Sequence, residues 1–268
     1  MKNDYLTEKK PLSALIIFAL PIIIGNLFQQ TYTMADSAIV GRLVGEDALA
    51  AVGASYALTN IFICIAVGGG VGASVIVSRY FGAKEYNRMK LAVSTAFLSF
   101  LAVSVLLAAF GLLFSRQIML ALHTPQEVLD MAAQYLSIYF LGLPFLFMYN
   151  VISSLFNALG KSKVPLCFLV FSSLFNIALD LVLVRQLHMG VAGVAWATLI
   201  AQGISALLSF GVFLYVLKKL DCGKTRAFDK KELADMTKIA LPSILQQSII
   251  SIGMMLVQSV VNGFGPQA

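Results

Sequence analysis

The sequence predicts an all-α integral membrane protein, a polytopic helical bundle. Of the 268 residues, 59% are hydrophobic and only 12% are charged, whereas soluble domains contain about 25% charged residues. The apolar residues also fall into seven long runs separated by short polar segments. A run of about 20 residues or more is long enough for a helix to cross the hydrocarbon core of a bilayer.

The first two predicted helices cover residues 12–40 and 48–80. The first contains Pro21. A kink at proline is tolerated in a membrane helix because neighbouring groups satisfy the freed carbonyl. The second contains a cluster of four glycines, which favours close contact between helices or a bend: Gly68, Gly69, Gly70 and Gly72.

Five further helices are predicted at similar spacing, over 91–114, 131–159, 164–184, 191–217 and 239–261. The fourth helix of the chain has Pro144 in its middle. The segment 218–238 is rich in Lys and Arg, so we expect a basic loop between the sixth and seventh helices.

The basic residues define one side of the predicted bundle. Sixteen of the 19 Lys and Arg residues precede the first helix or fall in loops on the same side, whereas Arg42, Arg116 and Arg185 fall on the other side. Because cytoplasmic loops carry the excess of Lys and Arg, we expect a cytoplasmic N-terminus in a bacterial-type plasma membrane. The sixteen are Lys2, Lys9, Lys10, Arg79, Lys84, Arg88, Lys90, Lys161, Lys163, Lys218, Lys219, Lys224, Arg226, Lys230, Lys231 and Lys238.

A weak internal repeat favours an architecture of two lobes. Ala19-Leu20-Pro21 and Ala240-Leu241-Pro242 each begin a segment that leaves the cytoplasmic side, and the ends of the two segments align with Val44 as one extra residue. Six helices separate the two starts, so the repeat is parallel rather than inverted.

This repeat predicts a division into three parts. We expect a six-helix N-terminal transporter lobe over 1–217, a cytoplasmic basic inter-lobe loop over 218–238, and the first helix of a truncated second lobe over 239–268. The expected whole is a protein of about twelve helices, and a complete seven-helix protein is the alternative.

Two acidic residues lie inside apolar spans. Of the 13 Asp and Glu residues, only Asp36 and Asp180 fall within the predicted spans, and no Lys or Arg lies well inside a span to pair with them. Unpaired acids within a membrane are costly and point to a proton or cation site. Asn176 precedes Asp180 by four residues and so shares its helical face.

Other oxygen donors are predicted near the same depth. A rise of 1.5 Å per residue places Asp180 roughly 24 Å from the cytoplasmic end of its helix. Asp36, Thr198 and Tyr135 also fall in the outer half, and Asn150 and Asn176 lie deeper. Such oxygens suit Na⁺ or a proton relay rather than a soft metal. For Tyr135, Asn150 and Thr198, ordinary hydrogen bonding between helices is the alternative role.

Several short motifs support a family resemblance. They include Met34-Ala35-Asp36 followed by Val40-Gly41-Arg42-Leu43, then Asn157-Ala158-Leu159-Gly160-Lys161, Asn176-Ile177-Ala178-Leu179-Asp180, and Gly190-Val191-Ala192-Gly193-Val194-Ala195-Trp196-Ala197-Thr198. Together they resemble the multidrug and toxic compound extrusion (MATE) family over essentially the whole chain.

The resemblance implies a twelve-helix antiporter with two six-helix lobes, which exchanges H⁺ or Na⁺ for organic cations and other amphipathic compounds. By that similarity, Asp36, Asn176, Asp180 and Thr198 form the cation site of the N-terminal lobe, and Tyr135 and Asn150 are further candidates.

The predicted function is therefore cation-coupled export of drugs or other organic cations across the plasma membrane, with Pro21 as a candidate hinge. No enzymatic activity and no organic cofactor are expected, only H⁺ or Na⁺ as coupling ion, with Asp36 and Asp180 as candidate Na⁺ ligands. His123 and His188 fall in separate outer loops, so no other metal site is expected. The expected partners are amphipathic or cationic small molecules and the lipid bilayer, with no nucleic acid, and the protein is expected to be monomeric.

Three other classes of protein are considered. A lipid-linked precursor flippase or polysaccharide exporter of similar architecture would be expected to carry basic residues inside its spans, and the predicted spans have none well inside them. An intramembrane aspartyl enzyme built on Asp36 and Asp180 lacks a recognisable catalytic motif. A seven-helix receptor is disfavoured by the predicted cytoplasmic N-terminus.

Overall fold

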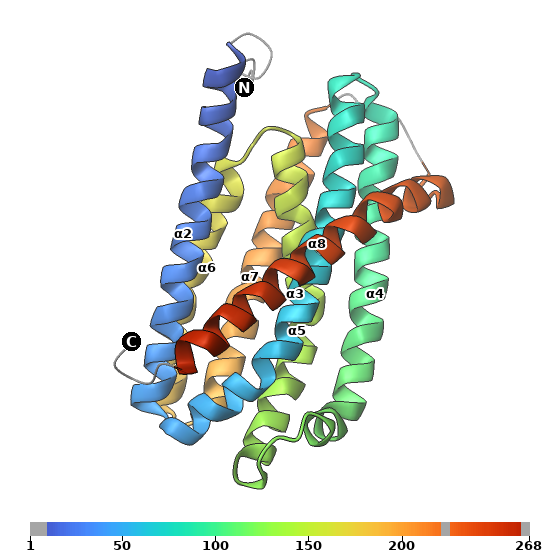
Figure 1. Cartoon of the computed structure of the whole chain (residues 1–268). Coiled ribbons are helices and arrows are strands. Elements are labelled where there is room, and N and C mark those ends of the chain that lie inside the picture. The colour runs from blue at the N-terminus through green and yellow to red at the C-terminus, as the bar shows by residue number, and fades with distance from the viewer. Residues whose placement is uncertain (1–9, 221–225, 264–268) are drawn as a thin grey trace.

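The computed structural model describes residues 10–220 and 226–263, which form a bundle of long helices (Figure 1). In chain order these are α2 (Pro11–Leu43), α3 (Glu46–Gly82), α4 (Tyr86–Ala121), α5 (Gln126–Ala158), α6 (Lys163–Asp180), the π-helix η1 (Leu181–Gln186), α7 (Gly190–Lys218) and α8 (Lys230–Gly263). Lys2, Lys9 and Lys224, together with the end of the predicted repeat at 264–268, lie outside the described residues.

Six segments are long and apolar enough to cross a membrane: α2, α3, α4, α5, α6 continued by η1, and α7. They confirm the first six predicted helices and a multi-pass membrane protein. A seventh helix, α8, is also present, but within the described residues it is not one of these six segments. Its first turns carry Lys230, Lys231, Glu232 and Asp235, whereas the sequence from 239 to 263 contains no charged residue.

The predicted ranges of three helices were wrong. Helix α4 extends beyond both ends of the predicted range 91–114, α5 begins at Gln126 rather than at residue 131, and α8 begins at Lys230 rather than at residue 239. The predicted ranges followed the apolar runs, whereas the backbone hydrogen bonds of these helices continue into polar turns beyond them. Helix length in a membrane protein is therefore greater than the length of its hydrocarbon-crossing part.

Helix α5 is the centre of the bundle and packs against α3, α4 and α7. Aromatic side chains join it to its neighbours. The rings of Phe62 and Phe140 meet edge-to-face with centroids 5.3 Å apart, and those of Phe156 and Phe213 meet in the same way at 5.2 Å. Helix α2 instead packs mainly on α6 and leaves many large apolar side chains exposed.

Helix α8 runs obliquely across α3 (Figure 1). The glycines of α3 permit this approach. A methyl group added at Gly68 would lie 2.6 Å from the backbone nitrogen of Ile244, and one added at Gly72 would lie 2.5 Å from the carbonyl oxygen of Met236. The close helix contact predicted for this glycine cluster is confirmed.

The beginning of α8 is fixed to the rest of the bundle by hydrogen bonds. Asp229 Oδ1 accepts from the backbone N–H groups of Lys231 (2.7 Å) and Glu232 (3.1 Å), which caps the helix and explains its start at Lys230. The backbone N–H of Asp229 donates to Thr95 Oγ1 of α4 at 3.1 Å. The Tyr80 hydroxyl of α3 donates to Glu232 Oε1 at 2.8 Å.

We expect Gly72→Ala to destabilise the protein by about 1–3 kcal/mol, because the added methyl group must displace the α8 backbone. The measurement is the thermal unfolding midpoint of the purified protein in detergent. Gly53→Ala is the matched control, since Gly53 lies in the same helix with no atom within 4 Å of the added carbon. Equal unfolding midpoints for the two variants would contradict the crossing described here.

Candidate functional site

The buried face of α6 is polar. The buried residues of this helix are Ser173, Asn176 and Asp180, spaced at helical intervals on one side. Asp180 is fully buried at the last position of α6. The wide turns of η1 follow directly, with a hydrogen bond of 3.1 Å from Leu187 N–H to the Val182 carbonyl. Such π-segments occur often at functional sites.

Helix α2 presents a second polar face to α6. Gln29, Tyr32 and Asp36 recur at intervals of three and four residues, so they lie on one side of the helix. The hydroxyls of Thr31, Thr33 and Ser37, which are exposed, each donate to the carbonyl four residues earlier in the same helix: Leu27, Gln29 and Thr33. Such bonds satisfy these hydroxyls within a membrane span and favour bending of the helix.

Asn176 connects three helices. In the amide orientation that satisfies all its neighbours, its nitrogen donates to Asp180 Oδ2 (3.0 Å) and to the Tyr32 hydroxyl (2.8 Å). Its oxygen then accepts from the hydroxyl (3.3 Å) and the backbone N–H (3.0 Å) of Thr198. With the amide turned over, the Tyr32 hydroxyl donates to Asn176 Oδ1 at 2.8 Å. In either orientation α2, α6 and α7 are joined through this one side chain.

The carboxyl groups of Asp36 and Asp180 lie within hydrogen-bonding contact of each other. The Oδ1 atom of each is buried and has no hydrogen-bond partner among the described residues. Among the described residues, no Lys or Arg forms an ion pair with either acid. Two adjacent carboxylates without a basic partner repel each other, so the pair favours uptake of a proton or a cation.

Two small cavities lie beside the polar neighbours of this pair, although neither Asp36 nor Asp180 lines them. One of about 60 Å³ is lined by Tyr32, Asn176 and Thr198, with Gln29 and Gln202 beside them. A water molecule needs roughly 10–15 Å³ of such space, so the cavity has room for water or a small ion. Thr198 also lines a second cavity, of about 10 Å³, together with Tyr135. Tyr135 lies close enough to both carboxyl groups for their charges to act on it.

The structure brings five of the six predicted site residues together: Asp36, Asn176, Asp180, Thr198 and Tyr135. It does not bring Asn150 to them, because the Asn150 amide donates to the Leu146 carbonyl of its own helix at 2.8 Å. Pro21 is buried within α2, near the opposite end of the helix from Asp36. The functional roles of all seven residues remain predictions.

Tyr32, Gln29 and Gln202 were not identified from the sequence. Each has a signal that could have found it, because Tyr32 precedes Asp36 by four residues, Gln29 precedes Asp36 by seven, and Gln202 follows Thr198 by four. A search for polar residues one or two turns from each intramembrane acid or candidate donor would have included them.

Fold and site together define a polytopic membrane protein of the transporter type, in which apolar helices enclose two unpaired carboxyl groups. The MatE family model matches residues 21–182. The chain is 32% identical over 266 residues to the "Probable multidrug resistance protein YpnP" of Bacillus subtilis (strain 168). The aligned region covers 99% of this chain and 59% of that protein.

Solved structures agree. A MATE crystal structure in the straight conformation matches with a TM-score of 0.86 and 27% identity, over 97% of this chain and 58% of that one. A MATE crystal structure in the bent conformation matches with a TM-score of 0.86 and 25% identity, over 98% of this chain and 59% of that one. The chain belongs to the MATE family and spans about 59% of the length of the curated relative described above.

We expect Asn176→Ala to destabilise the protein by about 1–3 kcal/mol, because Asp180 Oδ2 and the Tyr32 hydroxyl each lose a buried hydrogen bond. Thermal unfolding in detergent measures the effect. Asn26→Ala is the matched control, since Asn26 is exposed on α2, and a change within about 0.5 kcal/mol is expected there. An Asn176→Ala variant as stable as the control would disprove the bridging role of this amide.

Proposed function

We propose that this chain is the N-terminal lobe, with the first helix of a second lobe, of a cation-coupled antiporter that exports amphipathic or cationic small molecules. The observation that carries the proposal is the contact of Asp36 on α2 with Asp180 on α6, without a basic partner among the described residues. The membrane is the plasma membrane, and the lysine-rich end of the bundle is cytoplasmic.

The coupling step is a change of charge at the carboxyl pair. With both acids ionised, the pair attracts an organic cation or Na⁺. When one acid takes up a proton, or when Na⁺ binds between them, the negative charge of the pair decreases. The attraction of the pair for an organic cation then weakens. Uptake of the coupling ion on the outer side therefore favours release of the exported cation there.

The second step is a change in the shape of α2. Pro21 provides no N–H for the carbonyl of Ile17, so the helix is weakened at this turn. Between Pro21 and Asp36, two hydroxyls bond back to carbonyls of the same helix, and a third, of Ser37, does so directly after Asp36. Because Asp36 lies on this helix, neutralising the carboxyl pair removes the repulsion between Asp36 and Asp180 and so changes the force between α2 and α6.

The names of the relatives support drugs as the transported molecules and a change of shape. The Bacillus subtilis relative is named a probable multidrug resistance protein, and the matching solved structures are named as straight and bent conformations of a MATE protein. The outward direction of transport and the bending of α2 are our proposal for the complete protein that contains this chain.

Asp36→Asn and Asp180→Asn are each expected to reduce gradient-driven export to the level of protein-free liposomes, because an amide neither takes up nor releases a proton and binds Na⁺ without a charge. The measurement is transport of a fluorescent organic cation by the complete two-lobe transporter in proteoliposomes, under an imposed H⁺ or Na⁺ gradient. The gradient that drives wild-type transport identifies the coupling ion.

The control for this experiment is Asp47→Asn, which removes an exposed carboxylate from the first turn of α3. This variant should transport as wild type does. Unimpaired gradient-driven export by both the Asp36 and the Asp180 variants would overturn the proposed function.

Pro21→Ala is expected to slow transport without unfolding the protein, because alanine restores the missing N–H and stiffens α2. The rate is measured in the same proteoliposomes, and correct folding is checked by thermal unfolding. Pro144→Ala is the matched control, since Pro144 is also internal to a helix but lies in α5, the centre of the bundle. A wild-type transport rate for the Pro21→Ala variant would show that Pro21 is not a hinge for transport.

A further inference from the structure

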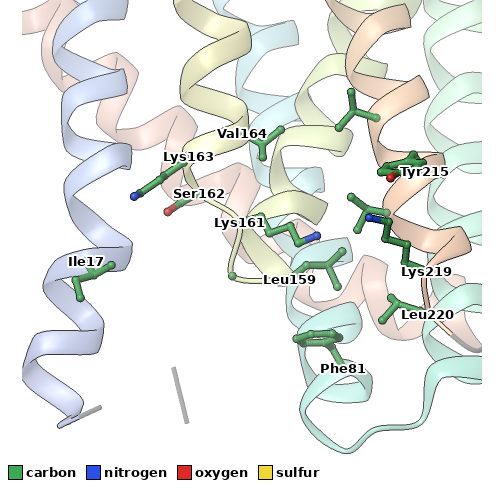
Figure 2. Close-up of a pocket in the computed structure, with 13 residues that line it drawn as sticks. Ile17, Phe81, Leu159, Lys161, Ser162, Lys163, Val164, Tyr215, Lys219 and Leu220 are labelled. Carbon is green, nitrogen blue, oxygen red and sulfur yellow. The ribbon is translucent and has the colours of Figure 1, made fainter. Parts of the chain in front are cut away.

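A larger cavity lies at the opposite end of the bundle from the carboxyl pair. It has a volume of about 750 Å³ and lies between α2, the α5–α6 loop, and the ends of α3 and α7 (Figure 2). Lys163, on its rim, is the first residue of α6, whereas Asp180 is the last. Asp180 follows Lys163 by 17 positions, which correspond to roughly 26 Å along the helix. The cavity is therefore a separate site.

The rim of the cavity is basic. Lys161 and Lys219 approach each other from the α5–α6 loop and from the end of α7, and Lys163 extends toward α2 (Figure 2). Lys219 Nζ lies 4.4 Å from the centre of the Tyr215 ring. None of the residues that line the cavity is acidic, and among the described residues these three lysines form no ion pair. Their charges are therefore uncompensated.

Two features of the cavity act on the Lys161 amino group: its partial burial and the nearby charge of Lys219. Partial burial, and next the charge of Lys219, lower the pKa of Lys161. The two lysines are therefore close enough to repel each other, and an anion between them would remove that repulsion.

Ser162 adds a further polar group. It is 96% buried, with 4% of its surface exposed, and it lines the cavity (Figure 2). Its hydroxyl forms no hydrogen bond with any described residue, and it does not cap the α6 helix that it precedes. The N-terminus of α6 itself offers few free donors, since the Val164 N–H donates to the Lys161 carbonyl at 3.0 Å and Pro165 has no N–H.

The walls of the cavity are apolar. Ile17 of α2, Phe81 of α3, Val164 of α6, and Val212 and Val216 of α7 line it. On α2, Leu15 and Ile16 next to Ile17 are exposed on the outside of the bundle. A basic rim beside apolar walls that continue to an exposed apolar surface matches a molecule with an anionic head and an apolar chain.

We propose that this cavity binds one anionic phospholipid, with its phosphate between Lys161 and Lys219 beside Ser162, and with an acyl chain along Ile17, Val164 and Val212. Basic pockets between helices at the cytoplasmic side of a membrane bind phospholipid head groups in this way. The choice of the cytoplasmic leaflet rests on the orientation given under the proposed function. Binding itself does not depend on that orientation or on transport.

The test is native mass spectrometry of the purified protein in detergent, titrated with dioleoyl phosphatidylglycerol or with dioleoyl phosphatidylcholine. One phosphatidylglycerol molecule should bind in preference to phosphatidylcholine. Lys161→Gln and Lys219→Gln should each weaken that binding about fivefold, which corresponds to about 1 kcal/mol for a basic residue at an anionic membrane surface. Thermal unfolding checks that each variant is folded.

Lys218→Gln is the matched control, because Lys218 is exposed, adjacent to Lys219 and absent from the cavity lining. This variant should bind phosphatidylglycerol as the unmodified protein does. Equal binding of both lipids, an equal loss in the Lys218 and Lys219 variants, or displacement of the lipid by inorganic phosphate alone would each overturn the proposal. Asp36→Asn should retain lipid binding, so a failure of this proposal is distinguishable from a failure of the proposed transport.

Discussion

The contact between Asp36 and Asp180 is the constraint on which the rest of the site depends. A charged carboxylate in the hydrocarbon region of a membrane is strongly unfavourable unless it is paired or hydrogen-bonded. In this protein the compensation comes from neighbouring polar side chains. Asn176 donates to Asp180 Oδ2 and contacts Tyr32 and Thr198, so that three helices are held at one point. The packing of α2 on α6 is thus tied to the state of the acids.

The two halves of the lobe differ in how they are held together. Helices α3, α4, α5 and α7 share buried aromatic side chains and form the rigid part of the bundle. Helix α2 contacts α6 and, to a smaller extent, α3, and it joins α6 through the Tyr32–Asn176 hydrogen bond. A helix held by a few polar contacts responds to a change in charge more readily than one held by a packed apolar core. This difference is consistent with α2 as the moving element.

Much of the fold could be predicted from the sequence, because the apolar runs and the positions of Lys and Arg report directly on the membrane. The two intramembrane acids were visible for the same reason. The rotation of each helix about its own axis could not be predicted. Lipid-facing residues are as apolar as buried ones, so the usual periodicity of apolar residues is lost. Asn150 illustrates this limit: its depth suggested a site residue, but its amide bonds within its own helix. Tyr32 was missed because its hydrogen-bond partner, Asn176, lies on another helix, α6. The π-helix after Asp180 carries no sequence signal of its own.

The anchored start of α8 has a mechanical consequence. Hydrogen bonds from Tyr80 and to Thr95 fix this helix near its first turn, and it contains 34 residues, which corresponds to a length of about 51 Å. It is also held along its middle, because Gly68 and Gly72 of α3 lie against Ile244 and Met236, and Ser251 Oγ lies 3.3 Å from Cys64 Sγ. A helix held at its start and along its middle moves with α3 as one body. A rearrangement of α3 therefore displaces α8 along its length, together with whatever packs on the exposed side of this helix.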